Sequence, residues 1–310
     1  MNNKEDINSN LLFSGEIDLR EIFLVLWKNK YLISFSTFIF SIIFITYSLT
    51  IQNVYKAEAI YEIRSKDESS NSLSSLAARY GGIASLVGIN LSQGGDESFL
   101  VIEKLKSKSF AKHLSKIEGI KQNFFAVKKY DPKNKTIEYD LDVYDPSKAE
   151  WTLIRDGKVH EPTALEFFDA LKARLNVDVN TESGFLEISF FHRSPEFASS
   201  FLKTAIKEIN RISKNQDKAK ANFALEYLNE RLVKTPSKDV RESINELIKT
   251  QLRILMISDV NDNYLLEPID PPYIPEGKYS PSRKLYAILG FLLGGFLGIF
   301  YTLFFHYYKK

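Results

Sequence analysis

The chain of 310 residues has no cysteine, which excludes disulfides, thiol catalysis and cysteine-ligated metals. Histidine is scarce, and no two histidines have the spacing of metal ligands. We expect surface or packing roles for all of them: His113, His160, His192 and His306. The chain also has no large excess of either charge, since it contains 41 Lys and Arg and 39 Asp and Glu. No basic cluster is interleaved with aromatic residues, so we expect no nucleic-acid partner. We also expect no metal and no cofactor.

Charge is absent from two stretches near the ends of the chain, from Tyr31 to Ile51 and from Leu285 to Tyr308. Each is long enough to cross a bilayer core of about 30 Å at about 1.5 Å per residue. We therefore assign membrane helices to residues 31–52 and 285–308. The first stretch is not a cleaved signal peptide, because 30 residues precede it and no small-x-small cleavage site follows.

Glycine recurs every fourth residue inside the second apolar stretch, at Gly290, Gly294 and Gly298. Residues four apart share one face of a helix, and the missing side chains allow another helix to approach closely. We interpret these glycines as a helix-packing face. Glycine is also simply more common in membrane helices than in soluble ones, which is the plainer alternative.

The segments outside the two spans are short. Residues 1–16 are polar and expected to be disordered, residues 17–30 predict an amphipathic segment with Asp18 as its N-cap, and residues 309–310 end the chain. Two spans put both termini on one side of the membrane. The basic residues flanking the spans are balanced, so the positive-inside rule does not decide the orientation.

Residues 53–193 predict a compact α/β body. We expect strands at 54–63, 135–144, 175–179 and 185–192, and helices at 97–117 and 163–175. Thr163 and Glu166 have the spacing of a capping box at the start of the second helix. Helices that interleave with strands imply one shared core.

Residues 194–260 predict a helical hairpin. Ser194 as N-cap and Pro195 at the first position start a long helix, Thr235-Pro236-Ser237 breaks it, and a second helix runs from Lys238 to about Ser258. The stretch 213–220 is polar on all sides, so the first helix must leave the body as a rod of roughly 55–60 Å. An isolated rod is marginal in water, so we expect self-association. The predicted assembly residues are Phe197, Phe201, Leu202, Ile206 and Ile209.

Residues 261–284 predict a return strand followed by an extended, proline-rich strap. Proline removes backbone donors and disfavours helix, so this segment should hold the body stiffly to the second span. The strap residues are Pro268, Pro271, Pro272, Pro275, Pro281 and Arg283. The predicted fold class is an α+β membrane protein, in which two transmembrane helices flank a body with a long projecting helical hairpin.

The residue pattern contains no recognisable catalytic site. Asp140 and Asp142 lie two apart in a predicted strand and so would face the same way, as in the Asp-x-Asp site of sugar-nucleotide transferases. We prefer the plainer interpretation of a solvated strand face, because nothing nearby resembles a nucleotide site. Neither Gly81-Gly82 nor Gly94-Gly95 is followed by the Lys-Ser/Thr of a phosphate loop. We expect a protein that is not an enzyme.

The order of segments resembles the chain-length determinant family, the polysaccharide co-polymerases of bacterial inner membranes. The resemblance extends over almost the whole chain from residue 17, through short motifs that are individually weak. These motifs are Ile17-Asp-Leu, Leu26-Trp27-Lys28-x-Lys30, Tyr55-x-Ala57, Gly81-Gly-Ile-Ala-Ser-Leu-Val-Gly-Ile89, Ser194-Pro195-x-x-Ala198, Tyr227-Leu-x-x-x-Leu232, Leu247-Ile-x-x-Gln251 and Ser280-Pro-Ser-Arg283.

This resemblance implies a multi-pass inner-membrane protein with cytoplasmic termini and a periplasmic body. It also implies a homo-oligomeric ring that sets how many repeats a polymerase adds to lipid-linked O-antigen or a related glycan, with the polymerase and that glycan as partners. Three other classes stay open: a component of capsule or exopolysaccharide export, a receptor with an outer sensing domain, and a glycosyltransferase using Asp140 and Asp142.

Overall fold

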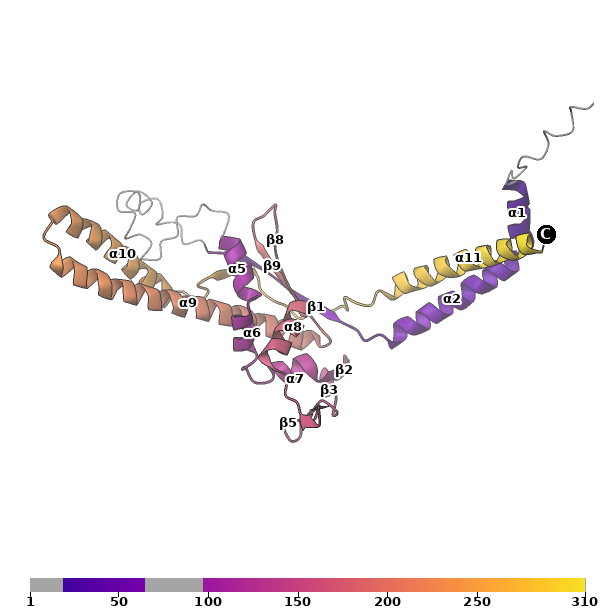
Figure 1. The fold of residues 1–310 in the computed structure, drawn as a ribbon, viewed down its shortest axis with the longest axis horizontal. Helices are drawn as coiled ribbons and strands as arrows, with labels where there is room; N and C mark the ends of the chain where they lie inside the picture. The colour runs from indigo at the N-terminus through magenta and orange to yellow at the C-terminus, as the bar shows by residue number, and fades with distance from the viewer. Residues whose placement is uncertain (1–18, 65–96, 310) are drawn as a thin grey trace, which may run out of the picture. The chain divides into compact units, whose positions relative to one another are not determined.

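The computed structural model describes residues 19–64 and 97–309 (Figure 1). The chain divides into a helical unit, formed by the residues up to Asn53 together with those from Ser280 onward, and a body from Val54 to Tyr279. The predicted tail at 1–16 and the glycine-containing motif at 81–89 lie outside the described residues.

The helical unit contains α1 (Leu19–Lys28), α2 (Lys30–Thr50) and α11 (Arg283–Tyr308). A single residue, Asn29, separates α1 from α2, and its side-chain amide donates to the carbonyl of Val25 at 2.9 Å. Helices α2 and α11 lie side by side and are both long and apolar enough to cross a membrane (Figure 1). The two apolar stretches of the sequence therefore form one helix each, packed against one another.

The body is built on an antiparallel sheet of four strands in the order β10-β1-β9-β8. Its strands are β1 (Tyr55–Ile63), β8 (Leu175–Val179), β9 (Leu186–His192) and β10 (Leu266–Asp270). Alternate residues of β1 from Tyr55 to Tyr61 are buried, as the period of two in the sequence predicts. The buried face of the sheet packs on the first part of the long helix α9 (Pro195–Lys234).

Short helices complete the core: α5 (Glu97–Leu105), α6 (Lys108–Leu114), α7 (Ile120–Phe125) and α8 (Ala164–Arg174). Aromatic rings from four elements meet there, with ring centroids 4.6 Å apart for Phe124 and Phe167 and 4.3 Å apart for Phe190 and Phe201. Complete burial of one such side chain contributes roughly 1.5–3 kcal/mol. These rings hold the sheet, α8 and the base of α9 together.

The predicted capping box at the start of α8 is confirmed. Thr163 Oγ1 accepts from the backbone N–H of Glu166, and the Glu166 carboxylate accepts from the backbone N–H of Thr163. This backbone hydrogen bond, with further ones from the side chains of Thr163, His160 and Arg155, lowers the pKa of Glu166 to about 2. The cap fixes the direction in which α8 enters the core.

Two predicted elements are corrected. The single helix expected at 97–117 is two helices, because Ser107 stops α5 and caps α6 by accepting from the N–H of Phe110. The strand expected at 135–144 ends at Tyr139, and Asp140 opens a turn in which its carboxylate accepts from the N–H of Asp142. Asp140 and Asp142 therefore do not share a strand face, which removes the geometric basis for an Asp-x-Asp metal site.

Three short two-stranded sheets lie between α7 and α8 in the chain, and most of their strands were not predicted from the sequence. They pair β2 (Val127–Asp131) with β3 (Thr136–Tyr139), β4 (Tyr144–Asp145) with β5 (Glu150–Trp151), and β6 (Ile154–Arg155) with β7 (Lys158–Val159). Strands of two residues are too short to show an alternating pattern.

The helical hairpin consists of α9 and α10 (Lys238–Val260), which lie side by side in Figure 1. At about 1.5 Å per residue, α9 is about 60 Å long. It starts as predicted, with Ser194 as N-cap and Pro195 in the first turn, and it ends before Pro236. Away from the main core of the body, a small cluster of buried Leu228, Ile244 and Leu247 holds the two helices together.

Where the chain returns from the hairpin to the sheet, its backbone is bound by one buried side chain, that of Asn210 in α9. Its Oδ1 accepts from the backbone N–H groups of Leu265 and Leu266, each at 2.8 Å, and its Nδ2 donates to the carbonyl of Leu266 at 3.3 Å. Asn210 therefore satisfies the backbone at the start of β10, where the edge strand would otherwise bury unpaired groups.

Replacing Asn210 with leucine should destabilise the body. The change leaves two buried N–H groups without acceptors, and each such group costs about 1–3 kcal/mol, so we expect a loss of at least about 2 kcal/mol. Chemical unfolding of the full-length protein in detergent, followed by circular dichroism, measures this. Asn215→Leu, an exposed position on the same helix, is the matched control. Equal losses in both variants would contradict the role of Asn210.

His192 is a second buried polar group of the body. Its Nε2 donates to the carbonyl of Asn123 at 2.8 Å, and its Nδ1 accepts from the N–H of Ser194 at 3.0 Å, which requires a neutral ring. Burial, with Arg174 and Arg193 nearby, lowers the pKa of His192 to about 4. Protonation would remove the acceptor for Ser194 and place a charge in the core.

The body should therefore lose stability as the pH falls from about 6.5, where an unfolded histidine titrates, to about 4, and lose no more through His192 below that. The expected loss is roughly 3 kcal/mol, at about 1.4 kcal/mol for each pKa unit. Unfolding midpoints between these pH values measure it. His192→Gln should flatten the dependence, and His113→Gln, a half-exposed position, should keep it. If the stability of His192→Gln depended on pH as steeply as that of the unaltered protein, His192 would not be the source of the pH dependence.

Candidate functional site

The three glycines predicted as a packing face lie against α2. We call Gly290, Gly294 and Gly298 the glycine seam; all three are buried. A Cβ atom added to Gly294 would lie 2.7 Å from the Cα of Thr37, and one added to Gly290 would lie 2.8 Å from the Cβ of Phe44. Such distances are too short for real atoms, so only glycine permits this approach of the two backbones.

Polar side chains reinforce the contact at the seam. Ser36 Oγ of α2 donates to the carbonyl of Gly294 at 3.0 Å, and Thr302 Oγ1 donates to the carbonyl of Gly298 at 2.7 Å. The first of these bonds joins two helices that are distant in the sequence. Hydrogen bonds of this kind and close van der Waals packing drive helix association in a bilayer, where apolar burial against lipid contributes little.

Gly295 shows that the seam occupies one face only. A Cβ atom added there would lie 3.6 Å from Thr37 Oγ1, which is an ordinary contact. The sequence therefore contains two adjacent glycines of which one is required by packing and the other is not.

The proline-rich strap contains no helix between residues 271 and 282. Pro268 lies in β10, opposite Tyr61 of β1. Pro272 and Pro275 are buried, and the carbonyl of Pro272 accepts from Ser199 Oγ of α9 at 3.4 Å. Pro271 and Arg283 are exposed, and Pro281 is buried. The part of the strap that belongs to the body is thus attached to it rather than free.

The residues expected to form the assembly surface of the hairpin lie elsewhere. Phe201, Leu202, Ile206 and Ile209 are buried in the core of the body, and Phe197 packs against the same core. They are covered within one chain, so the structure assigns them to folding and not to contacts between copies. Helical spacing alone does not reveal which surface covers an apolar flank.

The exposed apolar side chains of the hairpin are a different set. They lie along α9 and α10 on both sides of the small cluster that joins the helices. They are Phe223, Val233, Leu252, Met256, Ile257 and Val260, with exposed fractions of 72%, 87%, 45%, 69%, 42% and 83%.

The titratable side chains within residues 19–64 and 97–309 form no metal-binding cluster. No group of three or more His, Asp or Glu side chains there has the geometry to hold a metal ion. Three of the groups with shifted pKa values have structural partners: His192 in the core, Glu166 in its capping box, and Tyr264, whose hydroxyl donates to Asp217 at 3.0 Å and whose pKa is raised by burial. What the described residues offer is a packed helix pair and a projecting pair of helices.

These features define an α+β protein with two candidate membrane helices and a long helical region, as predicted from the sequence. Residues 15–117 match the family model described as Wzz, chain length determinant protein. The resemblance noted in the sequence is confirmed by this match, which covers about a third of the chain.

Solved structures are similar to the chain as well. A full-length bacterial polysaccharide co-polymerase is 13% identical, with a TM-score of 0.45, over 94% of this chain and 98% of the other. A fragment of WzzB, the polysaccharide co-polymerase from Salmonella Typhimurium, is 15% identical, with a TM-score of 0.30, over 74% of this chain and 100% of the other. Among curated proteins, none matches the chain in sequence.

Two contributors were missed in the sequence. Ser36 carries the hydrogen bond between the spans, and its signal was present, because hydroxyl residues recur at Ser36, Thr37 and Ser41 in an otherwise apolar run. Asn210 had no such signal, since a polar residue in a helix that leaves the body looks like a solvated one.

Gly294→Leu should separate α2 from α11, whereas Gly295→Leu should not, because only the first side chain collides with the backbone of Thr37. The chain has no cysteine, so Tyr47→Cys with Tyr286→Cys supplies a single thiol pair at the end of the helices where the two tyrosine rings lie 6.3 Å apart. A short thiol-reactive crosslinker applied in membranes should join this pair several-fold less well in Gly294→Leu. Equal crosslinking in both variants would show that the seam is not required.

Proposed function

We propose that this protein regulates the length of lipopolysaccharide O-antigen, or of a related surface glycan, as a membrane-anchored scaffold without a reaction centre of its own. The family match supports the coarser statement, a role in determining polysaccharide chain length. The finer statement rests on the arrangement of the chain, in which two helices of membrane-spanning length pack closely at Gly294.

The observation that carries the proposal is the glycine seam. Close packing through Gly294, with a hydrogen bond from Ser36, makes α2 and α11 a single two-helix anchor. The body begins directly after α2, and the strap that precedes α11 is fixed to the body through Pro272. The chain thus leaves and re-enters the two-helix anchor within a few residues of the body, and this attachment would serve as a steric boundary for a polymerase.

The orientation and the partners belong to the proposal. We place both termini in the cytoplasm and the body in the periplasm of a bacterial inner membrane. Copies of the chain would assemble into a ring through the exposed apolar side chains of the hairpin, because such side chains are stabilised by neighbours that cover them. The O-antigen polymerase and the lipid-linked glycan are the proposed partners of this assembly.

The glycan ladder on a gel tests the proposal. Deleting the protein should change a clustered length distribution into a broad one, because the steric boundary is lost. Gly294→Leu should reproduce the broad distribution with a folded body, and Gly295→Leu should keep the clustered one.

Normal chain length combined with lost export after deletion would contradict the proposal and favour the alternative, a component of capsule or exopolysaccharide export. An unchanged ladder in Gly294→Leu, together with lost crosslinking of the spans, would show that the seam has no part in setting length.

A further inference from the structure

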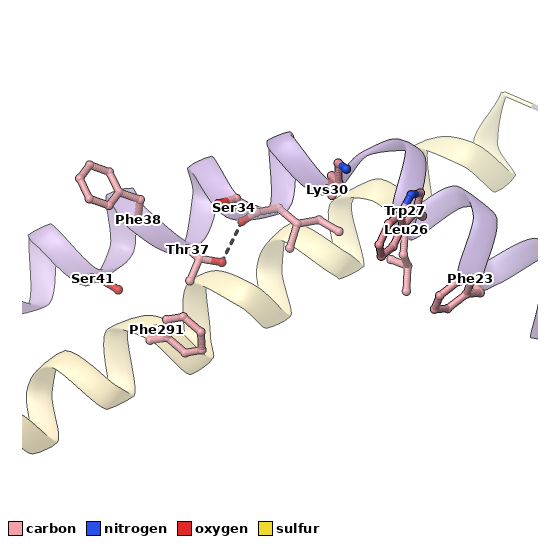
Figure 2. A pocket seen from close by; sticks show the side chains of 10 residues that line it. Phe23, Leu26, Trp27, Lys30, Ser34, Thr37, Phe38, Ser41 and Phe291 are labelled. Carbon is pink, nitrogen blue, oxygen red and sulfur yellow. Dashed lines mark hydrogen bonds between the residues drawn. The ribbon is translucent and has the colours of Figure 1, made fainter.

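A groove of about 490 Å³ lies in the helical unit between α1, α2 and α11. Its lining is apolar except for hydroxyl groups and one charged side chain, Lys30 (Figure 2). Phe23, Trp27 and Lys30 lie at one end of the groove, and Phe38, Ser41 and Phe291 lie toward the other. The volume is in the range of small-ligand pockets, about 300–1,000 Å³.

The length of the groove matches one leaflet of a membrane. Its lining follows α2 from Lys30 to Ser41. At about 1.5 Å per residue this distance is about 16 Å, close to half of a hydrocarbon core of about 30 Å. A ligand that fills the groove is therefore apolar over the depth of one leaflet and meets Lys30 at the surface of the bilayer.

The surface end of the groove is built for an anion. The ammonium group of Lys30 lies 4.8 Å from the ring centroid of Trp27, and both side chains are exposed. No Asp or Glu occurs in the sequence at 22–53 or 283–309. Among the described residues no carboxylate forms an ion pair with Lys30. A cation beside an exposed indole at the membrane surface attracts an anionic lipid head group.

We propose that this groove binds an anionic phospholipid, with one acyl chain along α2 and the lipid phosphate at Lys30. A second protein helix fits less well, because it would need an acidic group at Lys30. The site does not depend on the proposed function, only on the membrane position of α2 and α11.

Fluorescence quenching by brominated lipids tests the site on the full-length protein in lipid nanodiscs. The chain has two tryptophans, so Trp151→Phe leaves Trp27 as the sole reporter at the mouth of the groove. Brominated phosphatidylglycerol in a phosphatidylcholine background should quench Trp27 about fivefold more effectively than brominated phosphatidylcholine at the same fraction, and the quenching should saturate. Lys30→Gln should remove this preference.

The matched control is Lys284→Gln, at the far end of the helix pair, where Tyr286 of α11 contacts Tyr47 of α2. It should keep the preference. Equal quenching by the two lipids, or a preference that survives Lys30→Gln, would overturn the proposal. Absence of quenching by either lipid would overturn it too, because the groove would then be filled by protein.

A second measurement covers the case in which Trp151→Phe does not fold. Native mass spectrometry of the unaltered protein, released from membranes that contain both lipids, should show phosphatidylglycerol retained in preference to phosphatidylcholine, and Lys30→Gln should lose it. Equal retention of the two lipids would count against the site.

Discussion

The contact of α2 with α11 at Gly294 sets a condition that the rest of the helical unit must satisfy. The two backbones are so close that any side chain at this position would enter the space of Thr37 Cα. This closeness brings Ser36 within hydrogen-bond reach of a backbone carbonyl on the other helix. It also fixes the separation of the helices, so the groove along α1 and α2 has defined walls. Replacing Gly294 with any residue that has a side chain therefore affects the helix packing, the hydrogen bond from Ser36 and the shape of the groove together.

The body relies on a different principle, the covering of a small antiparallel sheet by one face of a long helix. The base of α9 supplies Phe201, Leu202 and Ile206 to the core, and further along the same helix Leu228 packs against Ile244 and Leu247 of α10. The return of the chain to the sheet depends on Asn210, because its side-chain oxygen accepts from the backbone N–H groups of Leu265 and Leu266 at the start of β10. Apolar burial holds α9 in place, and one buried amide determines where the sheet resumes.

Most of the secondary structure could be predicted because its signals are local. The capping box of Thr163 and Glu166, the start of α9 at Ser194 and its end before Pro236 each depend on a few neighbouring residues. The break at Ser107 was missed because apolar spacing continues through it, and the turn at Asp140 was missed because the alternation outlasts the strand.

The candidate site was less predictable. The glycine spacing indicates a packing face but not its partner, which depends on the tertiary pairing of α2 with α11. The apolar flank of α9 near Phe201 and Ile209 has the same spacing whether the body or a second copy covers it, so the sequence cannot separate these cases. The periodicity of apolar residues indicates that a helix face is covered, but it does not indicate which surface covers it.

The continuity of α9 makes it a lever. A single unbroken helix is anchored at its base among the aromatic rings of the core and extends to the tip of the hairpin. Over a length of about 60 Å, a tilt of about 1° at the base displaces the far end by about 1 Å. Small rearrangements around Phe190 and Phe201 are therefore magnified at the tip, and a force applied at the tip acts with the same mechanical advantage on the packing of the sheet.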